Sequence, residues 1–510
     1  MSGDWMKCWR TRHQFAAGML VWSVCTILLH PLIVMAADSA PVEIANESLS
    51  VNDEQERFLE DLSRRTFRYF LETADPTHEL VPNRYPSEPL GTSIGGQGFA
   101  LTAWGMGVER GYITRERARE LTLKNLRGLY LAPQGEAAQG TSGQRGFYYH
   151  FLNLKTVQRA ATSELSTIDS ALFLMGVLFA QSYFDRDHPE EAQIRTLAEK
   201  IYRRVQWDWT ARDTTGAVRM SYRPERGWSL HDWEGYNEGM MIYVLGLGSP
   251  TYPLHERSWT GGWSAKLPER WGRFYDQEHL IFGPLFGHQY SHVWIDFRGI
   301  QDAFMRSKGI DYFENSRRAT LAQRAYAQLN PNGWTGYGGN IWGWTASDGP
   351  LVLTREVDGV ERAFRGYMAR GIDPALLIDD GTIAPTAAGG SIPFAPEIAI
   401  PALMEMKQRF GQYIYNDYGF VDAFNLTFTI EDAELQRGKV HQGFGWSDSD
   451  HLVIDQGVML LMIENHRSGL IWKVMRGNPH IVRGLQRMGF SGGWLESAGK
   501  SAHGRDIDRG

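Results

Sequence analysis

The chain has 510 residues, of which 12% are aromatic, and its formal net charge at neutral pH is −7. This mild acidic excess, without any basic stripe, argues against a nucleic-acid partner. Both cysteines, Cys8 and Cys25, lie near the N-terminus, so the rest of the chain has no disulfide and no thiolate metal site. Its stability must therefore come from a large core.

Residues 1–36 are predicted to be a secretory signal peptide. Lys7 and Arg12 precede a long apolar stretch that ends in small residues, and cleavage is expected after Ala36. We therefore expect a periplasmic or secreted protein with no membrane association after cleavage, the alternative being retention of this segment as an anchor. Residues 37–52 are expected to form a flexible lead-in.

Residues 53–488 are predicted to form one helical domain. Helical spacing of apolar residues, with Thr114 and Pro189 at two helix starts, predicts helices near 53–74, 97–110, 114–130, 166–184, 189–205, 238–247, 297–306, 311–328, 396–410 and 454–466. Residues 146–153 and 217–224 alternate like pieces of β-hairpins. Residues 489–510 are expected to be a disordered tail, and we expect a monomer.

The loops between these helices are alternately short and long, and the long ones contain most of the Gly, Trp, His and Asp residues. Helical hairpins arranged in a ring, with elaborate loops at one end, would produce this pattern. The sequence therefore predicts an all-α fold of the (α/α) barrel type with minor β-hairpins.

Many tryptophans lie in polar, glycine-rich loops instead of in periodic apolar segments. Trp342 and Trp344 belong to the run NPNGWTGYGGNIWGWTASDGP, and Trp446 precedes a group of aspartates. Aromatic side chains in such loops are typical of flat walls that stack on sugar rings, whereas core packing is the alternative explanation.

Two carboxyl groups stand close together in WEGYNEGMM (233–241), directly before an apolar run. Hydrolysis of a glycosidic bond uses one carboxyl group as a proton donor and a second as a base or nucleophile. Burial among aromatic side chains would raise the pKa of Glu238 and suit it to the donor role, with Glu234 as its neighbour or rival. The alternative is an ordinary first-turn acid favoured by a helix dipole.

Other acids also occur in unusual surroundings. Asp169 opens an apolar helix, where capping is the alternative role, and Asp422 lies between two phenylalanines. Asp448 and Asp455 belong to a cluster that suggests calcium, but the complete EF-hand loop pattern is absent. Glu397 follows a proline and is interpreted as a first-turn acid.

His288 and His292 are spaced as on one face of a helix and could bind a metal, but the acid that marks zinc proteases is missing between them. Packing or binding of sugar hydroxyls is favoured instead. No nucleotide-binding or nucleophile-elbow motif is present, and we expect no metal and no cofactor.

The chain resembles the bacterial glucoamylase-like domain family, which includes the endo-β-1,2-glucanases of glycoside hydrolase family 144. The likeness runs in order from about residue 55 to about residue 485. It is carried by the segments STIDSALFLMG, WEGYNEGMMIYVLGLGSPTYPL, FGPLFGHQYSHVWIDFRG, NPNGWTGYGGNIWGWTASDGP, DDGTIAPTAAGGSIPFAPEIAIPAL and YGFVDAFN. The resemblance implies an (α/α)6 barrel and metal-free, inverting hydrolysis of β-1,2-glucan.

By matching motifs, the resemblance implies that Glu238 is the proton donor, Asp422 the base and Asp169 a further pocket acid. Asp448, Asp455 and Glu397 remain possible bases. The residues expected to contact the glucan are Trp233, Glu234, Tyr236, Asn237, His288, Gln289, Arg298, Trp342, Trp344 and Trp446.

Alternatives to an endo-acting β-1,2-glucanase are a hydrolase that releases disaccharides from a chain end, another glucan hydrolase or lyase of the same fold, and a glycan-binding protein without catalysis. The acidic, aromatic loops argue against a lyase, which needs basic residues around its uronic acid substrate. A binding protein has no use for several acids in unusual positions.

Overall fold

The computed structural model describes residues 53–87, 91–374 and 377–497. The predicted signal peptide, the lead-in and residues 498–510 lie outside the described residues. The chain divides into two units, 1–56 and 57–510, and of the first only the opening turn of helix α1 is described. In the described residues, no helix combines the length and the apolar character needed to cross a membrane.

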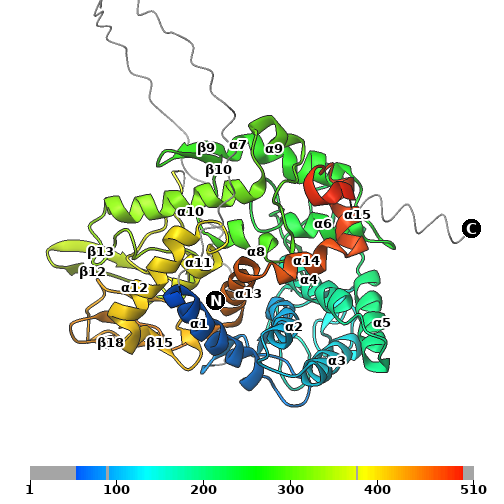
Figure 1. The fold of residues 1–510 in the computed structure, drawn as a ribbon, viewed down its shortest axis with the longest axis horizontal. Helices are drawn as coiled ribbons and strands as arrows, with labels where there is room; N and C mark the ends of the chain where they lie inside the picture. The colour runs from blue at the N-terminus through cyan, green and yellow to red at the C-terminus, as the bar shows by residue number, and fades with distance from the viewer. Residues whose placement is uncertain (1–52, 88–90, 375–376, 498–510) are drawn as a thin grey trace, which may run out of the picture. The chain divides into compact units, whose positions relative to one another are not determined.

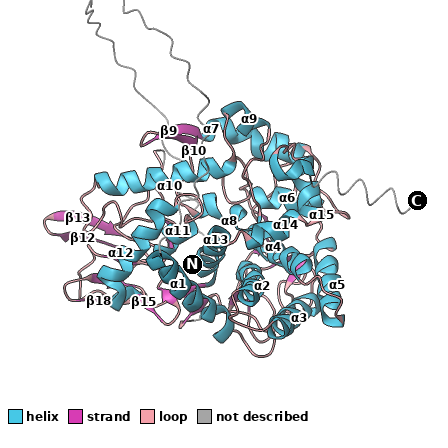
Figure 2. Ribbon diagram, in the orientation of Figure 1, coloured by secondary structure: helices cyan, strands magenta, loops and turns pink. Residues whose placement is uncertain are grey.

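The described part of the chain is mainly helical (Figures 1 and 2). Its α-helices are α1 (Asp53–Glu72), α2 (Ile94–Glu109), α3 (Arg115–Leu131), α4 (Thr167–Tyr183), α5 (Pro189–Arg203), α6 (Met240–Gly248), α7 (Leu267–Arg270), α8 (Phe286–Trp294), α9 (Ala303–Lys308), α10 (Tyr312–Leu329), α11 (Pro385–Gly390), α12 (Pro396–Ile414), α13 (Val453–Arg467), α14 (Leu470–Arg476) and α15 (Pro479–Arg487). Three further helical segments are η2 (Trp207–Thr210), η3 (Ser258–Trp263) and η4 (Ser264–Lys266).

The strands are short and form antiparallel pairs or three-stranded sheets between the helices. They are β1 (Arg84–Tyr85), β2 (Thr92–Ser93), β3 (Gly143–Gln144), β4 (Phe147–Tyr148), β5 (Phe151–Leu152), β6 (Leu165–Ser166), β7 (Ser221–Arg223), β8 (Gly227–Trp228), β9 (Trp271–Phe274), β10 (Gln277–Leu280), β11 (Ala346–Ser347), β12 (Leu353–Val357), β13 (Val360–Phe364), β14 (Met368–Ala369), β15 (Tyr415–Asn416), β16 (Gly419–Phe420), β17 (Phe424–Asn425), β18 (Lys439–His441), β19 (Gly445–Ser447) and β20 (His451–Leu452). The predicted hairpin pieces are therefore confirmed: β4 pairs with β3, and β7 pairs with β6 and β8.

The helices of the second unit form two groups. Helices α6, α8 and α11 are buried along their entire length, and α2, α4 and α13 nearly so. These six pack against one another, because α13 contacts α2, α2 contacts α4, α4 contacts α6, and α8 contacts α11, which contacts α13. The more polar helices α3, α5, α10, α12 and α15 pack against this group from outside (Figure 1).

The closest approach between inner helices is made by glycines of α2 and α4. A Cβ atom added to Gly98 would lie 2.0 Å from the carbonyl oxygen of Leu172, and one added to Gly176 would lie 2.2 Å from the carbonyl oxygen of Gly98. The two backbones therefore touch directly. This packing explains why α2 contains so many small residues and shows no amphipathic pattern.

Two predicted helix starts are confirmed. The Thr114 side chain caps α3 by accepting a hydrogen bond from the Arg117 N–H at 3.1 Å, and Pro189 occupies the first turn of α5. The predicted helix at 297–306 is wrong over most of its length. Only α9 is helical there, because it begins after the Asp302 cap and the preceding chain turns at Gly299, whose φ is +72°.

The predicted disorder after residue 488 is wrong for residues 489–497. Phe490 and Leu495 are buried in the main core, and the Trp494 indole N–H donates a hydrogen bond to the Asp296 carbonyl oxygen at 2.8 Å. A glycine-rich, polar composition suggested a tail, but two apolar side chains are enough to hold this segment against the helices.

We expect Gly98→Ala to lower the free energy of unfolding by more than about 3 kcal/mol, because the new methyl group would separate α2 from α4. Gly411→Ala is the matched control, since a Cβ there would have its nearest neighbour at an ordinary 3.7 Å. This helical substitution should leave the stability unchanged or raise it by up to about 1 kcal/mol. Guanidinium unfolding followed by circular dichroism measures both; equal stabilities would contradict the proposed close contact.

Candidate active site

Three of the acidic residues predicted to be functional lie at or near the beginnings of inner helices. Asp169 is in the first turn of α4, Glu238 comes two residues before α6, and Asp455 is in the first turn of α13. Tyr290 lies in α8, and its phenolic pKa is raised well above its usual value by burial, with further contributions from Asp455, Glu238 and Asp169. These acids from three helix starts therefore lie within electrostatic reach of one hydroxyl group, which places them around a common centre.

Glu238 has the environment expected of a proton donor. The residue keeps some accessible surface, but its Oε2 atom is shielded from solvent and has no hydrogen-bond partner among the described residues. Burial raises the pKa of Glu238 to about 7, and the negative charge of Asp169 contributes to the increase. Glu238 therefore keeps its proton through the weakly acidic range and releases it around neutral pH.

Asp169 is the third residue of its helix and not the N-cap. Ser166 is the cap: its Oγ accepts a hydrogen bond from the Asp169 N–H at 3.1 Å and donates one to the Asp169 carboxylate at 2.6 Å. The other carboxylate oxygen lies 3.6 Å from His150 Nε2. Burial alone would lower the pKa of His150, but Asp169 and Glu164 raise it above its usual value. Both carboxylate oxygens of Asp169 therefore have a polar neighbour, Ser166 on one side and His150 on the other.

A second group of acids surrounds Asp422. One oxygen each of Asp348, Asp422 and Asp448 lies within 4.8 Å of the others. Asp422 Oδ2 accepts a hydrogen bond from the Asp348 N–H at 2.6 Å, while Asp422 Oδ1 and Asp448 Oδ2 are buried without a partner among the described residues. The pKa of Asp422 is raised well above its usual range by burial, and then by the charges of Asp455 and Asp348.

Two arginines neutralise part of this charge. Arg84 binds Asp348 at 2.5 Å and Asp450 at 3.0 Å, and Arg437 binds Asp450 at 3.1 Å. Burial and the charge of Asp348 raise the pKa of Asp455 to about 8. Since Arg84 already holds Asp348, the cluster offers fewer free oxygens than the six to eight that Ca²⁺ prefers. Shared protons are the simpler way to balance the remaining charge.

The sequence prediction missed Tyr367, which follows β13 in a loop. The residue is 58% exposed, yet burial of its hydroxyl, followed by the charges of Asp455, Asp422 and Asp348, raises its pKa. The side chain is therefore partly open to solvent, while its hydroxyl lies within electrostatic reach of the acids. Nothing in the local sequence, RGYMA, distinguishes this tyrosine from an ordinary loop residue, because only the fold brings it above the acidic group.

Three of the predicted wall residues do not form a wall. Trp342, Trp344 and Trp446 are all 0% exposed, so none presents a ring face to a substrate. Trp446 instead donates its indole N–H to the Arg437 carbonyl oxygen at 2.8 Å and supports the segment that carries Arg437. The alternative of core packing is correct for these tryptophans, whose polar loops are themselves buried by the surrounding helices.

The residues around Glu238 shape its loop. Trp233 is buried and donates its indole N–H to Thr167 Oγ1 at 2.9 Å, and Asn237 Oδ1 accepts a hydrogen bond from the Gly239 N–H at 2.8 Å. Glu234 is half-buried, and burial followed by the charge of Asp232 raises its pKa.

His288 and Gln289 are not available to hold sugar hydroxyls. His288 is fully buried between the Tyr236 hydroxyl and the Phe282 carbonyl oxygen, each 3.0 Å away, and burial lowers its pKa far below the usual value. The Gln289 amide N–H₂ donates to the Ala387 carbonyl oxygen and to Ser391 Oγ. Both side chains, with the buried Tyr236, join α8 to its neighbours.

Two further predictions are wrong. Glu397 is exposed on α12 and pairs with Arg317 at 2.5 Å, so it is no candidate for the base. Arg298 lies beyond the C-terminal end of α8 and lines a cleft with the C-terminal end of α13, whereas Asp455 lies at the N-terminal end of α13. Arg298 is therefore at the wrong end to contact a substrate at the acids.

Comparison with known proteins places the chain in a family. Residues 230–479 match the family model described as "Glycoamylase: Putative glucoamylase". A crystal structure of a "putative glucoamylase" from Bacteroides uniformis is 32% identical, with a TM-score of 0.72, and the match covers 86% of this chain and 98% of that one. The chain belongs to this glucoamylase-like family.

Two relatives have named activities. An endo-β-1,2-glucanase of Chitinophaga pinensis, solved with sophorotriose and glucose, is 26% identical with a TM-score of 0.71, and the match covers 86% of this chain and 99% of that one. An exo β-1,2-glucooligosaccharide sophorohydrolase (non-reducing end) of Parabacteroides distasonis is 27% identical over 459 residues, which are 85% of this chain. The chain spans 58% of the length of that curated relative.

The pKa of Glu238 predicts how Glu238→Gln changes stability with pH. The folded-state value, about 7, lies above the unfolded one, so the native state is stabilised by this proton below pH 4 and loses that contribution as the pH rises through 7. The free energy of unfolding of Glu238→Gln minus that of wild type should therefore be larger at pH 8 than at pH 5. We expect this quantity to change by about 2 kcal/mol between the two pH values, allowing for the accessible part of the side chain.

Denaturant unfolding of wild type and Glu238→Gln at pH 5 and pH 8 measures this change. The other titrating groups are the same in the two proteins, so their contributions cancel when the free energies are subtracted. Glu397→Gln removes an exposed glutamate near another helix start and should show a much smaller pH-dependent difference. An equal effect of Glu238→Gln at both pH values would show that the Glu238 carboxyl group is not shielded from water.

Proposed function

We propose that the protein is a glycoside hydrolase that cleaves β-1,2-linked glucan with a pair of carboxyl groups. The observation that carries this proposal is the arrangement around Tyr290. Glu238, which has a shielded oxygen without a partner among the described residues and a pKa raised to about 7, and Asp455 of the aspartate group both act on this one hydroxyl and raise its pKa. A donor that holds its proton and an acceptor that can remove one are the two groups that glycoside hydrolysis needs.

The relatives support the substrate class. The activities named for them, endo-β-1,2-glucanase and β-1,2-glucooligosaccharide sophorohydrolase, both act on β-1,2-linked glucose. We propose the endo-acting mode for this chain, with release of disaccharides from a chain end as the alternative. The size of the first products formed from a long glucan distinguishes them, because an endo-acting enzyme produces a range of lengths.

In the proposed reaction, Glu238 gives its proton to the departing glycosidic oxygen as the bond to the anomeric carbon breaks. An aspartate of the second group takes a proton from a water molecule, whose oxygen forms the new bond on the opposite face of the sugar. The product anomer is therefore inverted, and both carboxyl groups return to their starting states when the aspartate releases its proton to solvent and Glu238 takes one up.

Asp422 is our first candidate for the base, and Asp455 is its rival. Asp422 has a buried oxygen without a hydrogen-bond partner among the described residues, which suits an acceptor for a water proton. Asp455, however, lies within electrostatic reach of both the Tyr290 and the Tyr367 hydroxyl groups and raises the pKa of each. Asp448 also has a shielded oxygen without a partner among the described residues, and burial followed by the charges of Asp348 and Asp422 raises its pKa as well.

We also propose that the six inner helices close into the ring of an (α/α)6 barrel. The chain of contacts from α8 through α11, α13, α2 and α4 to α6 supports it, as does the Tyr236–His288 hydrogen bond between the segments of α6 and α8. Export by the predicted signal peptide would bring such a monomeric enzyme to glucan outside the cytoplasm.

Glu238→Gln and Asp422→Asn should each reduce kcat on linear β-1,2-glucan by about 1,000-fold or more, because each removes a proton-transfer step. Asp455→Asn, tested beside them, distinguishes the two candidate bases: the true base shows the larger loss. Release of reducing sugar measures the rates, and unchanged circular dichroism spectra control for folding. Near-normal activity of Glu238→Gln would remove it from the donor role, and products of retained anomeric form would exclude the base mechanism.

Tyr367→Ala should raise KM for glucan by about tenfold with a smaller effect on kcat, because the exposed ring offers a stacking face beside the acids. Tyr367→Phe keeps the ring and should preserve most of the affinity. Tyr252, another partly exposed tyrosine, provides the matched control, Tyr252→Ala, with unchanged KM. If Tyr367→Ala changed only kcat, the hydroxyl and not the ring would be the important group.

A further inference from the structure

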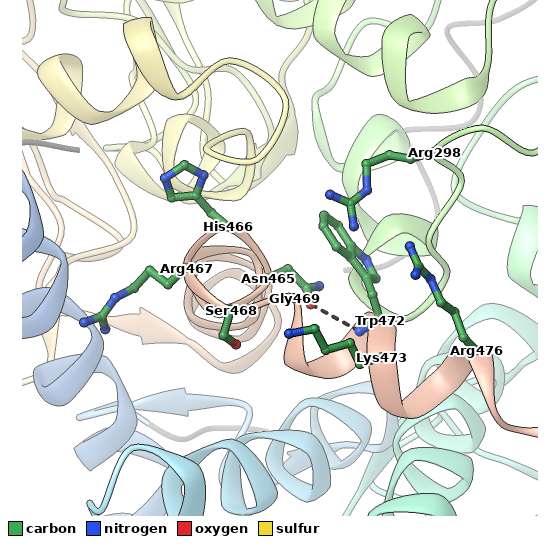
Figure 3. A pocket seen from close by; sticks show the side chains of 9 residues that line it. All are labelled: Arg298, Asn465, His466, Arg467, Ser468, Gly469, Trp472, Lys473 and Arg476. Atoms are coloured by element: carbon green, nitrogen blue, oxygen red, sulfur yellow. Dashed lines mark hydrogen bonds between the residues drawn. The ribbon is translucent and has the colours of Figure 1, made fainter. Parts of the chain in front are cut away.

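A cleft at the other end of the inner helices brings together residues that the proposed reaction does not use. It has a volume of about 320 Å³ and is lined by Arg298, Asn465, His466, Arg467, Ser468, Gly469, Trp472, Lys473 and Arg476. The residues come from the C-terminal end of α13, from α14 and from the segment after α8 (Figure 3). Four of the nine carry a positive charge, in a protein whose net charge is negative.

The acids near the cleft are already paired. Asp296 accepts two hydrogen bonds of 2.8 Å from Arg298 and also binds Arg476. Glu464 binds Arg110 and Ser468, each at 2.5 Å, and Arg467 binds Glu60 at 3.0 Å. These carboxylates are therefore occupied by arginines, and Lys473 adds a further positive charge to the lining.

Lys473 is the lining cation that is available to a ligand. Its side chain is exposed, its Cε atom lies close above Gly469, and its ammonium group has no acceptor among the described residues. The Nε–H of Arg476 is shielded from solvent and likewise has no acceptor in the described part of the chain. Figure 3 shows Arg298 and Arg476 extending toward each other beside Trp472, with Lys473 on the opposite side of that ring.

The cleft does not suit a sugar. Trp472 is 2% exposed, and the Arg298 guanidinium lies 4.1 Å from the centre of its ring, so the indole offers no stacking face. No unpaired carboxylate is present among the described lining residues to hold a cation. What the site offers is guanidinium and ammonium donors, which are the groups that bind oxyanions.

We propose that this cleft is a binding site for a phosphate group. Lys473 supplies a mobile point charge, while Arg298 and Arg476 are held in place by Asp296 and Trp472 and present their remaining N–H groups to the anion. The phosphate could belong to a free ion or to the head group of an anionic lipid, and both sources offer the same charged oxygens.

Isothermal titration of the full-length protein with inorganic phosphate, against chloride at equal ionic strength, tests the proposal. We expect phosphate-specific binding that Lys473→Gln weakens by about tenfold, because it removes one charge-assisted contact. Lys200→Gln replaces an exposed lysine on α5 and should bind like wild type. Thermal unfolding of both variants confirms that they fold.

Flotation with vesicles of phosphatidylglycerol, against phosphatidylcholine, distinguishes the two sources. Binding to phosphatidylglycerol vesicles that is lost in Lys473→Gln would assign the site to a lipid head group, and binding of inorganic phosphate alone would assign it to a free ion. Binding to neither probe, or wild-type affinity of Lys473→Gln for both, would overturn the proposal. None of these outcomes depends on the proposed glucan hydrolysis.

Discussion

A carboxyl group that is shielded from water holds its proton more strongly, and the functional end of this protein is built on that effect. Glu238 lies where an apolar inner helix begins, so its side chain cannot be fully hydrated, and its pKa rises to about 7. Such burial costs stability at neutral pH, and the surrounding core must offset it. The extensive apolar packing of the six inner helices provides that core without any disulfide in the described residues.

The two groups of acids have different partners. One carboxylate oxygen of Asp169 accepts a hydrogen bond from Ser166, and the other lies beside His150, whose pKa is raised. Asp422 and Asp455 repel each other and Asp348, so not all of them can be charged at once. One carboxylate of this group can therefore stay charged beside protonated neighbours and accept a proton while Glu238 holds its own, which is the requirement of the proposed hydrolysis.

The buried tryptophans have a structural role in this arrangement. The long loops that hold the acids contain many polar backbone groups, and large rings such as Trp342, Trp344 and Trp446 fill the space beneath them. The exposed tyrosine above the acids, Tyr367, is in contrast free to meet a substrate. The inner helices thus carry an acidic group at one end and, beyond α8 and α13, a basic cleft at the other.

The sequence by itself determined the longer helices, because the spacing of their apolar residues is local information. The observed starts of α3, α4, α5, α10, α12 and α13 all lie within two residues of the predicted ones. It also indicated Glu238, Asp169 and Asp422, since acids beside apolar runs are unusual. The short helices α8, α11 and α14 were missed, because their periodicity extends over too few residues.

Only the tertiary structure decided which residues share a site. Arg298 and His288 are ten residues apart in one motif, yet α8 separates them, with His288 buried among helices and Arg298 in the basic cleft. Tyr367 is brought to the acids from a loop without any distinctive pattern. Burial of a loop tryptophan, similarly, depends on helices distant in sequence. Proximity and desolvation are properties of the packed chain, so no local pattern of residues can specify them.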